Sequence, residues 1–295
     1  MASSSPKTPS NRFKRHPAVN TQTLSMSNMK LGTCQMEFEN NINAKLNGLR
    51  KFNAVMACFH LAQGLVLFLL STNFSLPVMS YFLEMDPISN KLTPVPEELF
   101  QLGLSPLITG FLIITAIAHA TVAFPGVFRW YARNLRKGAN YARWMEYSIS
   151  SSVMLVIIAM LVGIYDVGSL ILMFSLNATM ILFGWIMELH NQNVQDVNWA
   201  SYWFGTFAGI MPWVVIGVYL LGAGSGEGGP PGFVYGIFGS IFIFFNIFAI
   251  NMALQYKKIG PWQDYLFGER IYILLSLSSK SILAWQVFAG TLRPV

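Results

Sequence analysis

Four ionisable side chains lie deep inside apolar stretches of this sequence: His60, His119, Glu146 and Lys280. A basic residue near the end of each stretch lies nine residues from Glu146 and ten residues from each of the other three, which is about 13.5 to 15 Å of helix. These basic anchors are Arg50, Arg129, Lys137 and Arg270. We therefore expect the four side chains to share one layer near the middle of the membrane.

A lysine and a carboxylate in the same apolar layer can support two kinds of structure. Desolvation favours the neutral amine, which is the form that attacks an aldehyde to give a Schiff base. A protonated Schiff base needs an anion, and Glu146 is the carboxylate at this depth, while Ser276 lies one helical turn before Lys280. The same two charges could instead form a structural ion pair, with His60 and His119 packed in the core. The residue types leave both readings open.

The composition shows which elements must hold these residues. The chain is 54% hydrophobic and 11% charged, against roughly 25% charged residues in a soluble domain. Its apolar residues form runs of about 20, which is the length of a membrane-crossing helix, and they lack the alternation of membrane strands. The sequence therefore predicts an all-α fold, a bundle of seven transmembrane helices. The predicted spans are 52–70, 99–124, 142–164, 167–187, 199–221, 233–253 and 271–292.

Basic residues predict the orientation of the bundle, because Lys and Arg gather on the cytoplasmic side of a membrane. They lie before the first span, between the second and third spans, and between the sixth and seventh. The opposite side carries Lys91 and Arg293 beside four carboxylates. We therefore expect a cytoplasmic N-terminus and an extracellular C-terminus. The net charge of +6 follows from this membrane pattern, and no nucleic acid partner is expected.

Two regions are predicted along the chain. Residues 1–45 are basic and polar without a sustained apolar run, so we expect a mostly disordered cytoplasmic tail. Residues 46–295 form the membrane domain. The first external loop, about residues 72–98, contains four prolines and is long enough to fold over the outer face. No metal site and no catalytic residue is predicted, so we do not expect an enzyme.

Several segments resemble the heliorhodopsin family in order from the first to the seventh predicted span. Random apolar helices would not reproduce their polar residues at these positions. The segments are 58–63 (CFHLAQ), 143–152 (RWMEYSISSS), 177–185 (NATMILFGW), 231–236 (PGFVYG), 268–270 (GER) and 275–286 (LSLSSKSILAWQ).

The resemblance implies a light-sensing photoreceptor with a rhodopsin-like bundle and all-trans retinal as its cofactor. It implies that Lys280 holds retinal as a Schiff base and that Glu146 is the counterion. His60, His119 and Ser276 would form a polar, proton-accepting cluster on the cytoplasmic side. Family members insert with the N-terminus inside, generally form dimers and mostly signal, so a homodimer and a cytoplasmic signalling partner are expected. The expected retinal pocket comprises Tyr147, Ser151, Met154, Asn177, Met180, Gly184, Trp185, Trp213, Phe245 and Trp285.

Two features depart from the family pattern: the long N-terminal tail and Glu188 at the end of the fourth span. A carboxylate near an exit path could serve proton conduction, and some viral members of the family transport ions. We instead expect Glu188 to be a solvated charge beside His190. Two alternatives to a sensor stay open. One is a light-driven or light-gated proton or ion transporter on the same scaffold, and the other is a chromophore-free seven-helix receptor or transporter.

Overall fold

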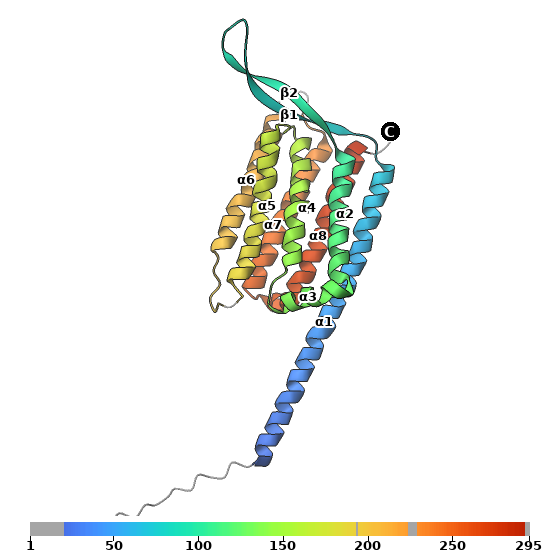
Figure 1. Ribbon diagram of the computed structural model, residues 1–295, viewed down its shortest axis with the longest axis vertical. Helices are drawn as coiled ribbons and strands as arrows, with labels where there is room; N and C mark the ends of the chain where they lie inside the picture. The colour runs from blue at the N-terminus through green and yellow to red at the C-terminus, as the bar shows by residue number, and fades with distance from the viewer. Residues whose placement is uncertain (1–20, 193, 224–228, 293–295) are drawn as a thin grey trace, which may run out of the picture. The chain divides into compact units, whose positions relative to one another are not determined.

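The computed structural model describes residues 21–192, 194–223 and 229–292, with side chains described from residue 35 onward. Residues 1–20 of the predicted tail and Arg293 lie outside this range. Within the described part, seven helices are long and apolar enough to cross a membrane, which confirms the predicted seven-helix bundle (Figure 1). They are α1 (Thr21–Leu70), α2 (Leu104–Ala123), α4 (Tyr141–Leu161), α5 (Val167–His190), α6 (Ala200–Ala223), α7 (Gly232–Tyr256) and α8 (Tyr265–Val287).

Three shorter helices are also present in the described part of the chain. Helix α3 (Pro125–Arg136) joins α2 to α4 and lies across one end of the bundle, here called the α3 end (Figure 1). It buries Tyr131, Ala132 and Leu135 and exposes its arginines, so it has one apolar and one basic face. The other two are η1 (Gly260–Gln263), before α8, and η2 (Phe288–Leu292), after it.

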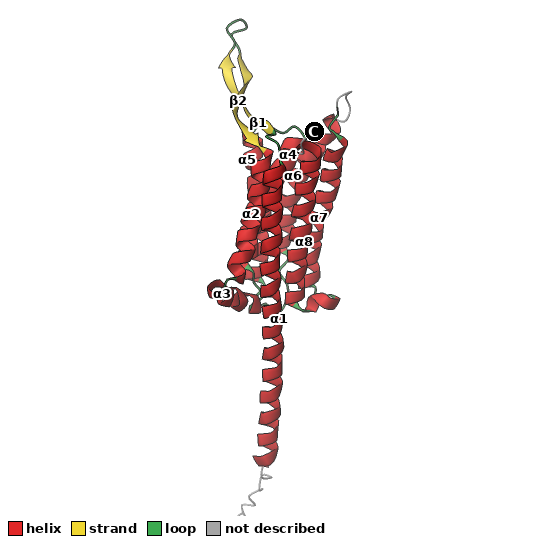
Figure 2. Ribbon diagram, turned by 90° about the vertical axis from the view of Figure 1, so that its right-hand side faces the viewer, coloured by secondary structure: helices red, strands yellow, loops and turns green. Residues whose placement is uncertain are grey.

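A long β-hairpin stands at the opposite end of the bundle, here called the hairpin end (Figure 2). Strands β1 (Ser75–Met85) and β2 (Leu92–Gly103) pair antiparallel, with an irregularity between Val78 and Met79. The strands contain Pro77, Pro94 and Pro96, and a two-stranded sheet accommodates proline because each strand has an edge without a neighbouring strand. At the tip, the Asp86 carboxylate accepts hydrogen bonds from Ser89 and Ile88, which lower the pKa of Asp86.

The hairpin differs from the expected loop over the outer face. Its base contacts the bundle, because Val78 is buried in the core and the Met79 amide donates to the Tyr165 carbonyl at 2.9 Å. Its distal residues are exposed. Residues 99–103 belong to β2, so α2 begins at Leu104, five residues later than the predicted span.

The expectation of disorder fails for the second half of the tail, because α1 begins at Thr21. Once the membrane-spanning part of α1 has formed, each further residue adds a backbone hydrogen bond without the cost of starting a new helix. No proline interrupts residues 21–45. A polar composition therefore did not exclude a helix that extends from an existing one.

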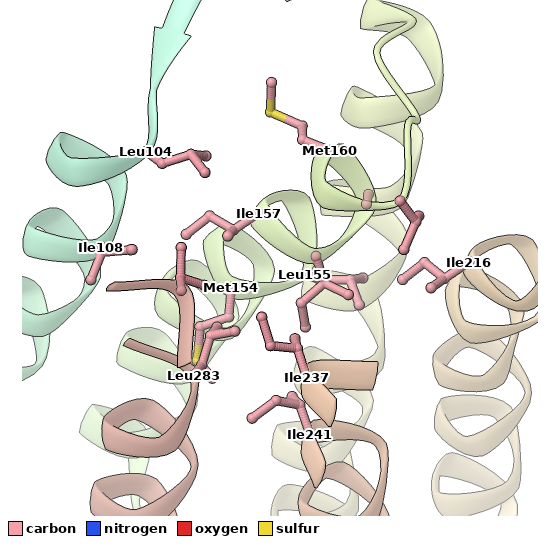
Figure 3. Packing of buried hydrophobic residues seen from close by; sticks show 14 of the residues in the cluster. Leu104, Ile108, Met154, Leu155, Ile157, Met160, Ile216, Ile237, Ile241 and Leu283 are labelled. Carbon is pink, nitrogen blue, oxygen red and sulfur yellow. The ribbon is translucent and has the colours of Figure 1, made fainter. Parts of the chain in front are cut away.

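Helix α4 supplies the core of the hairpin end. Its residues Met154, Leu155 and Ile157 are buried and pack with aliphatic side chains from four neighbouring helices (Figure 3). These partners are Leu104 and Ile108 of α2, Ile216 of α6, Ile237 and Ile241 of α7, and Leu283 of α8. The hairpin end of the bundle is therefore filled by apolar packing.

We predict that Leu155→Ala lowers the free energy of unfolding by about 2–5 kcal/mol, because it leaves a cavity in this core. The matched control is Leu172→Ala on α5, where the side chain is 70% exposed and no cavity forms. Thermal unfolding in detergent, followed by circular dichroism, measures both variants. An equal decrease in the free energy of unfolding in the two variants would contradict the packing described for α4.

Candidate functional site

The centre of the site is an ion pair between α8 and α4. The Lys280 Nζ donates to Glu146 Oε1 at 2.7 Å and to Ser276 Oγ at 3.0 Å. The two charged side chains are 3% and 7% exposed. Thr115 of α2 donates a further hydrogen bond to Glu146 Oε1. The structure thus brings together the lysine, the carboxylate and the serine that were singled out from the sequence, and it adds Thr115.

The two histidines form a stacked pair between α1 and α2. The rings of His60 and His119 are 5.6 Å apart at an interplanar angle of 8°. The Nδ1 of His119 lies 2.7 Å from Oδ1 of Asn53. Within the described residues, neither ring nitrogen of the buried His60 has a hydrogen-bond partner. The histidines therefore contact each other, as expected from their equal depths, and His119 lines a cavity together with Glu146.

That shared cavity is polar and runs from Glu146 toward the α3 end of the bundle. Five of its polar or charged lining residues come from α1, α2, α3, α4 and α8, so it lies where these helices meet. They are Asn53, His119, Tyr131, Arg143 and Glu269. The cavity therefore joins the Lys280–Glu146 pair to the α3 end of the bundle.

A second buried charge cluster lies at the far side of this cavity. Arg143 of α4 forms ion pairs with both Glu188 of α5 and Glu269 of α8. Asn140 binds the same two carboxylates, donating its backbone N–H to Glu188 at 2.8 Å and its side-chain amide to Glu269 at 2.6 Å. The four side chains are all buried. This cluster ties α4, α5 and α8 together.

The expectation that Glu188 is a solvated helix-end charge is wrong, since the residue is 1% exposed. Its burial is possible because Arg143 neutralises it and further donors surround it. The cluster was not predicted because Arg143 and Glu269 lie at the ends of the predicted spans 142–164 and 271–292, where charged residues are common. One feature of the sequence indicated a buried Arg143: it lies three residues before Glu146 and therefore on the same, inward face of α4.

An apolar cavity lies on the other side of the Lys280 amine. Five residues of the expected retinal pocket line it: Tyr147, Ser151, Met154, Met180 and Phe245. Ser276, which was expected beside the Lys280 amine, lines it as well. Four further lining residues were not expected from the sequence: Ser150, Ile181, Phe248 and Ser279.

Two further cavities continue this space away from Lys280, and Met180 and Phe245 line all three. One lies among α4, α5, α6 and α7 and includes Gly184, where an added Cβ would come within 2.5 Å of the Trp144 ring. The other lies between α6 and α7 and includes Trp213. The lysine therefore stands at the end of an extended apolar space.

Three residues of the expected pocket lie elsewhere. Asn177 is buried and donates hydrogen bonds to Ser151 and Ser152, so it holds Ser151, which lines the cavity beside Lys280, in position. Trp185 packs against the Tyr141 ring at 5.5 Å. Trp285 is 40% exposed and donates to Gln63 of α1. None of the three lines the cavities described above.

Comparison with solved structures relates the fold to that of microbial rhodopsins. The chain is similar to the light-driven proton pump Coccomyxa subellipsoidea rhodopsin CsR, with a TM-score of 0.55 and 15% identity over 83% of this chain and 96% of that chain. At this identity the likeness shows the fold alone.

Comparison with curated proteins finds no match. A family model described as Heliorhodopsin matches residues 49–292, which include both histidines, Glu146 and Lys280. Because this match spans most of the sequence and all seven membrane helices, the chain belongs to the heliorhodopsin family.

Proposed function

We propose that this protein is a light-sensing photoreceptor in which Lys280 holds all-trans retinal as a Schiff base and Glu146 is the counterion. The observation that carries the proposal is the buried pair of Lys280 and Glu146, 2.7 Å apart, at the end of an extended apolar cavity. The family and the fold imply a retinal-binding, photoreceptor-type membrane protein. The proposal adds the attachment residue, the counterion and the sensory role.

The side chains present fit this cofactor. Retinal is an elongated apolar aldehyde, and the three adjoining cavities offer aromatic and methionine walls with an amine at one end. The Lys280 amine would form a C=N bond with the aldehyde carbon, with loss of the carbonyl oxygen as water. When bound, retinal supplies the absorption of visible light. Glu146 would provide the negative charge beside the nitrogen, and Thr115 and Ser276 would hold the two groups in place.

The distribution of polar groups supports a sensor over an ion transporter. The described polar cavity extends from Glu146 toward the α3 end, where Arg143 and Glu269 lie. Toward the hairpin end, buried aliphatic residues such as Leu155 and Ile158 fill the space between the helices. An ion that crosses the membrane needs polar partners or water along its path, and the aliphatic cluster between the helices opposes its passage at this end. A proton could therefore move within one half of the protein without crossing it.

The remaining parts of the proposal concern orientation and partners. The basic residues of α3 support a cytoplasmic α3 end and N-terminus by the positive-inside rule. A homodimer and a cytoplasmic signalling partner rest on the family resemblance. Expression of the chain with a tag at either end, followed by accessibility labelling, tests the orientation.

We predict that Lys280→Ala abolishes the visible band that forms when all-trans retinal is added to the purified protein, because the aldehyde loses its nucleophile. Absorption spectra with and without retinal measure the effect. The change also leaves the buried Glu146 without its cation, so the double variant Lys280→Ala/Glu146→Gln is the control for folding. A covalently bound, coloured product in either variant would contradict the assignment.

We predict that Glu146→Gln keeps retinal binding and shifts the visible band to longer wavelength, or causes its loss at a lower pH than in the wild type. The reason is that the protonated nitrogen loses its negative partner. A titration of the absorption spectrum measures both effects. Glu97→Gln, on the exposed strand β2, is the control with the same chemical change. A spectrum and titration like those of the wild type would mean that another group is the counterion.

Illumination under voltage clamp separates the sensor from the transporter. We expect cells that express the retinal-loaded wild type to show no sustained photocurrent, because the aliphatic core blocks the hairpin end. Cells that express Lys280→Ala provide the baseline. A sustained current in the wild type that is lost in Glu188→Gln would replace the sensor with a proton transporter.

A further inference from the structure

We infer that Glu269 is a proton-binding site that takes up a proton released from the Lys280–Glu146 pair and keeps it inside the protein. In this transfer an N–H or O–H bond at the pair breaks and an O–H bond at the Glu269 carboxylate forms, so no other reactant is needed. The light-driven release of the proton rests on the proposed function. The capacity of Glu269 to bind a proton is independent of the proposed function.

The polar cavity gives a route between the two places. Glu146 and Glu269 both line it, together with His119, Tyr131 and Asn140. A proton that leaves Glu146 therefore meets polar side chains on the way to Glu269.

An unsatisfied donor also indicates that water occupies this cavity. Arg143 lines it, and its Nε is buried without a hydrogen-bond partner among the described residues. Buried polar groups that lack a protein partner are commonly satisfied by internal water. Such water would complete a hydrogen-bonded path between the two carboxylates.

The number of donors at each carboxylate of the second cluster favours Glu269 over Glu188. A carboxylate offers about four acceptor sites. Glu188 receives four hydrogen bonds and is therefore saturated, so protonation would force one of them to break. The four donors are the Asn140 backbone N–H, Arg143 Nη2, Trp144 Nε1 at 2.6 Å and the Tyr265 hydroxyl at 3.0 Å. Among the described residues, Glu269 receives two, from Asn140 Nδ2 and Arg143 Nη1, and it keeps acceptor sites for a proton.

The balance of charge leads to the same residue. The cluster contains one cation, Arg143, and two carboxylates, so it carries an excess negative charge when both are ionised. A proton on Glu269 leaves a neutral Arg143–Glu188 pair, which is the less costly state in a buried site. The other titratable groups around the cluster are Tyr131 of α3, His119 of α2, Tyr147 of α4, Tyr256 of α7, and Tyr265 and Tyr272 of α8, and none of these adds a second permanent cation.

The location of Glu269 explains why the proton would stay. The residue lies in the second turn of α8 at the α3 end and is 1% exposed. Its neighbour Arg270 is exposed, so the boundary with solvent falls directly beyond the cluster. A proton on Glu269 would therefore be stored close to the surface without release, and its arrival would alter the ion pairs that join α4, α5 and α8.

Light-induced infrared difference spectroscopy of the full chain with retinal in lipid tests the transfer. We expect a carbonyl band of a newly protonated carboxyl group in the wild type, lost in Glu269→Gln. Glu269→Asp should keep this band and move its frequency, while the matched Glu188→Asp should leave the frequency unchanged. Glu269→Gln retains the neutral Arg143–Glu188 pair, so it should fold. A band that persists in Glu269→Gln, or that moves in Glu188→Asp alone, would overturn the inference.

Acid titration of the chain without retinal separates this inference from the proposed function. We expect the carbonyl band of buried carboxyl groups to grow as the pH falls in the wild type and in Glu97→Gln, and to lack the contribution of one carboxyl group in Glu269→Gln, where Glu146 and Glu188 remain. If this result is obtained while retinal gives no visible band, the proton site stands and the proposed function fails. If retinal binds but Glu269→Gln leaves both the light-induced and the acid-induced bands unchanged, the proposed function stands and Glu269 is excluded as the proton site.

Discussion

The structure depends on one constraint: a charge inside a membrane must be neutralised and hydrogen-bonded by the protein itself. Helix α4 meets this constraint twice within one turn. Glu146 pairs with Lys280, and Arg143 pairs with Glu188 and Glu269. Both ion-pair clusters join α4 to α8, so the helix that carries the proposed attachment lysine is held by charge at two depths. The same contacts that neutralise these side chains also fix the geometry of the site.

The two ends of the bundle have different interiors as a consequence. All five charged residues of the two clusters lie between mid-membrane and the α3 end, and the polar cavity lies among them. The hairpin end is packed with leucine, isoleucine and methionine from α2, α4, α6, α7 and α8. Polar groups need partners or water, and apolar side chains pack most densely with each other, so this separation satisfies both kinds of side chain. It also supports the proposal that protons move within one half of the protein without crossing it.

Much of this arrangement followed from the sequence, because membrane spans depend on the length of apolar runs and buried charges depend on depth. The ten-residue spacings of His60, His119 and Lys280 placed them in one layer with Glu146, and the contacts among them agree. The helical part of the tail and the hairpin were not predicted, since both depend on what adjoins them: a long helix in one case and strand pairing in the other. The partners of Arg143 could not be predicted either, because α5 and α8 are distant in sequence and residues near span ends serve equally as topology signals. Trp285 was expected in the retinal pocket because it is aromatic and lies near Lys280 in sequence. Its side chain instead donates a hydrogen bond to Gln63 of α1.

The central claim is that the buried amine of Lys280 is the attachment point of retinal. Reduction of the retinal-loaded protein with sodium borohydride converts a C=N linkage into a stable secondary amine, and digestion followed by mass spectrometry then locates it. We predict a single retinyl-modified peptide that contains Lys280. Attachment at another lysine, or a visible band without any modified peptide, would contradict it.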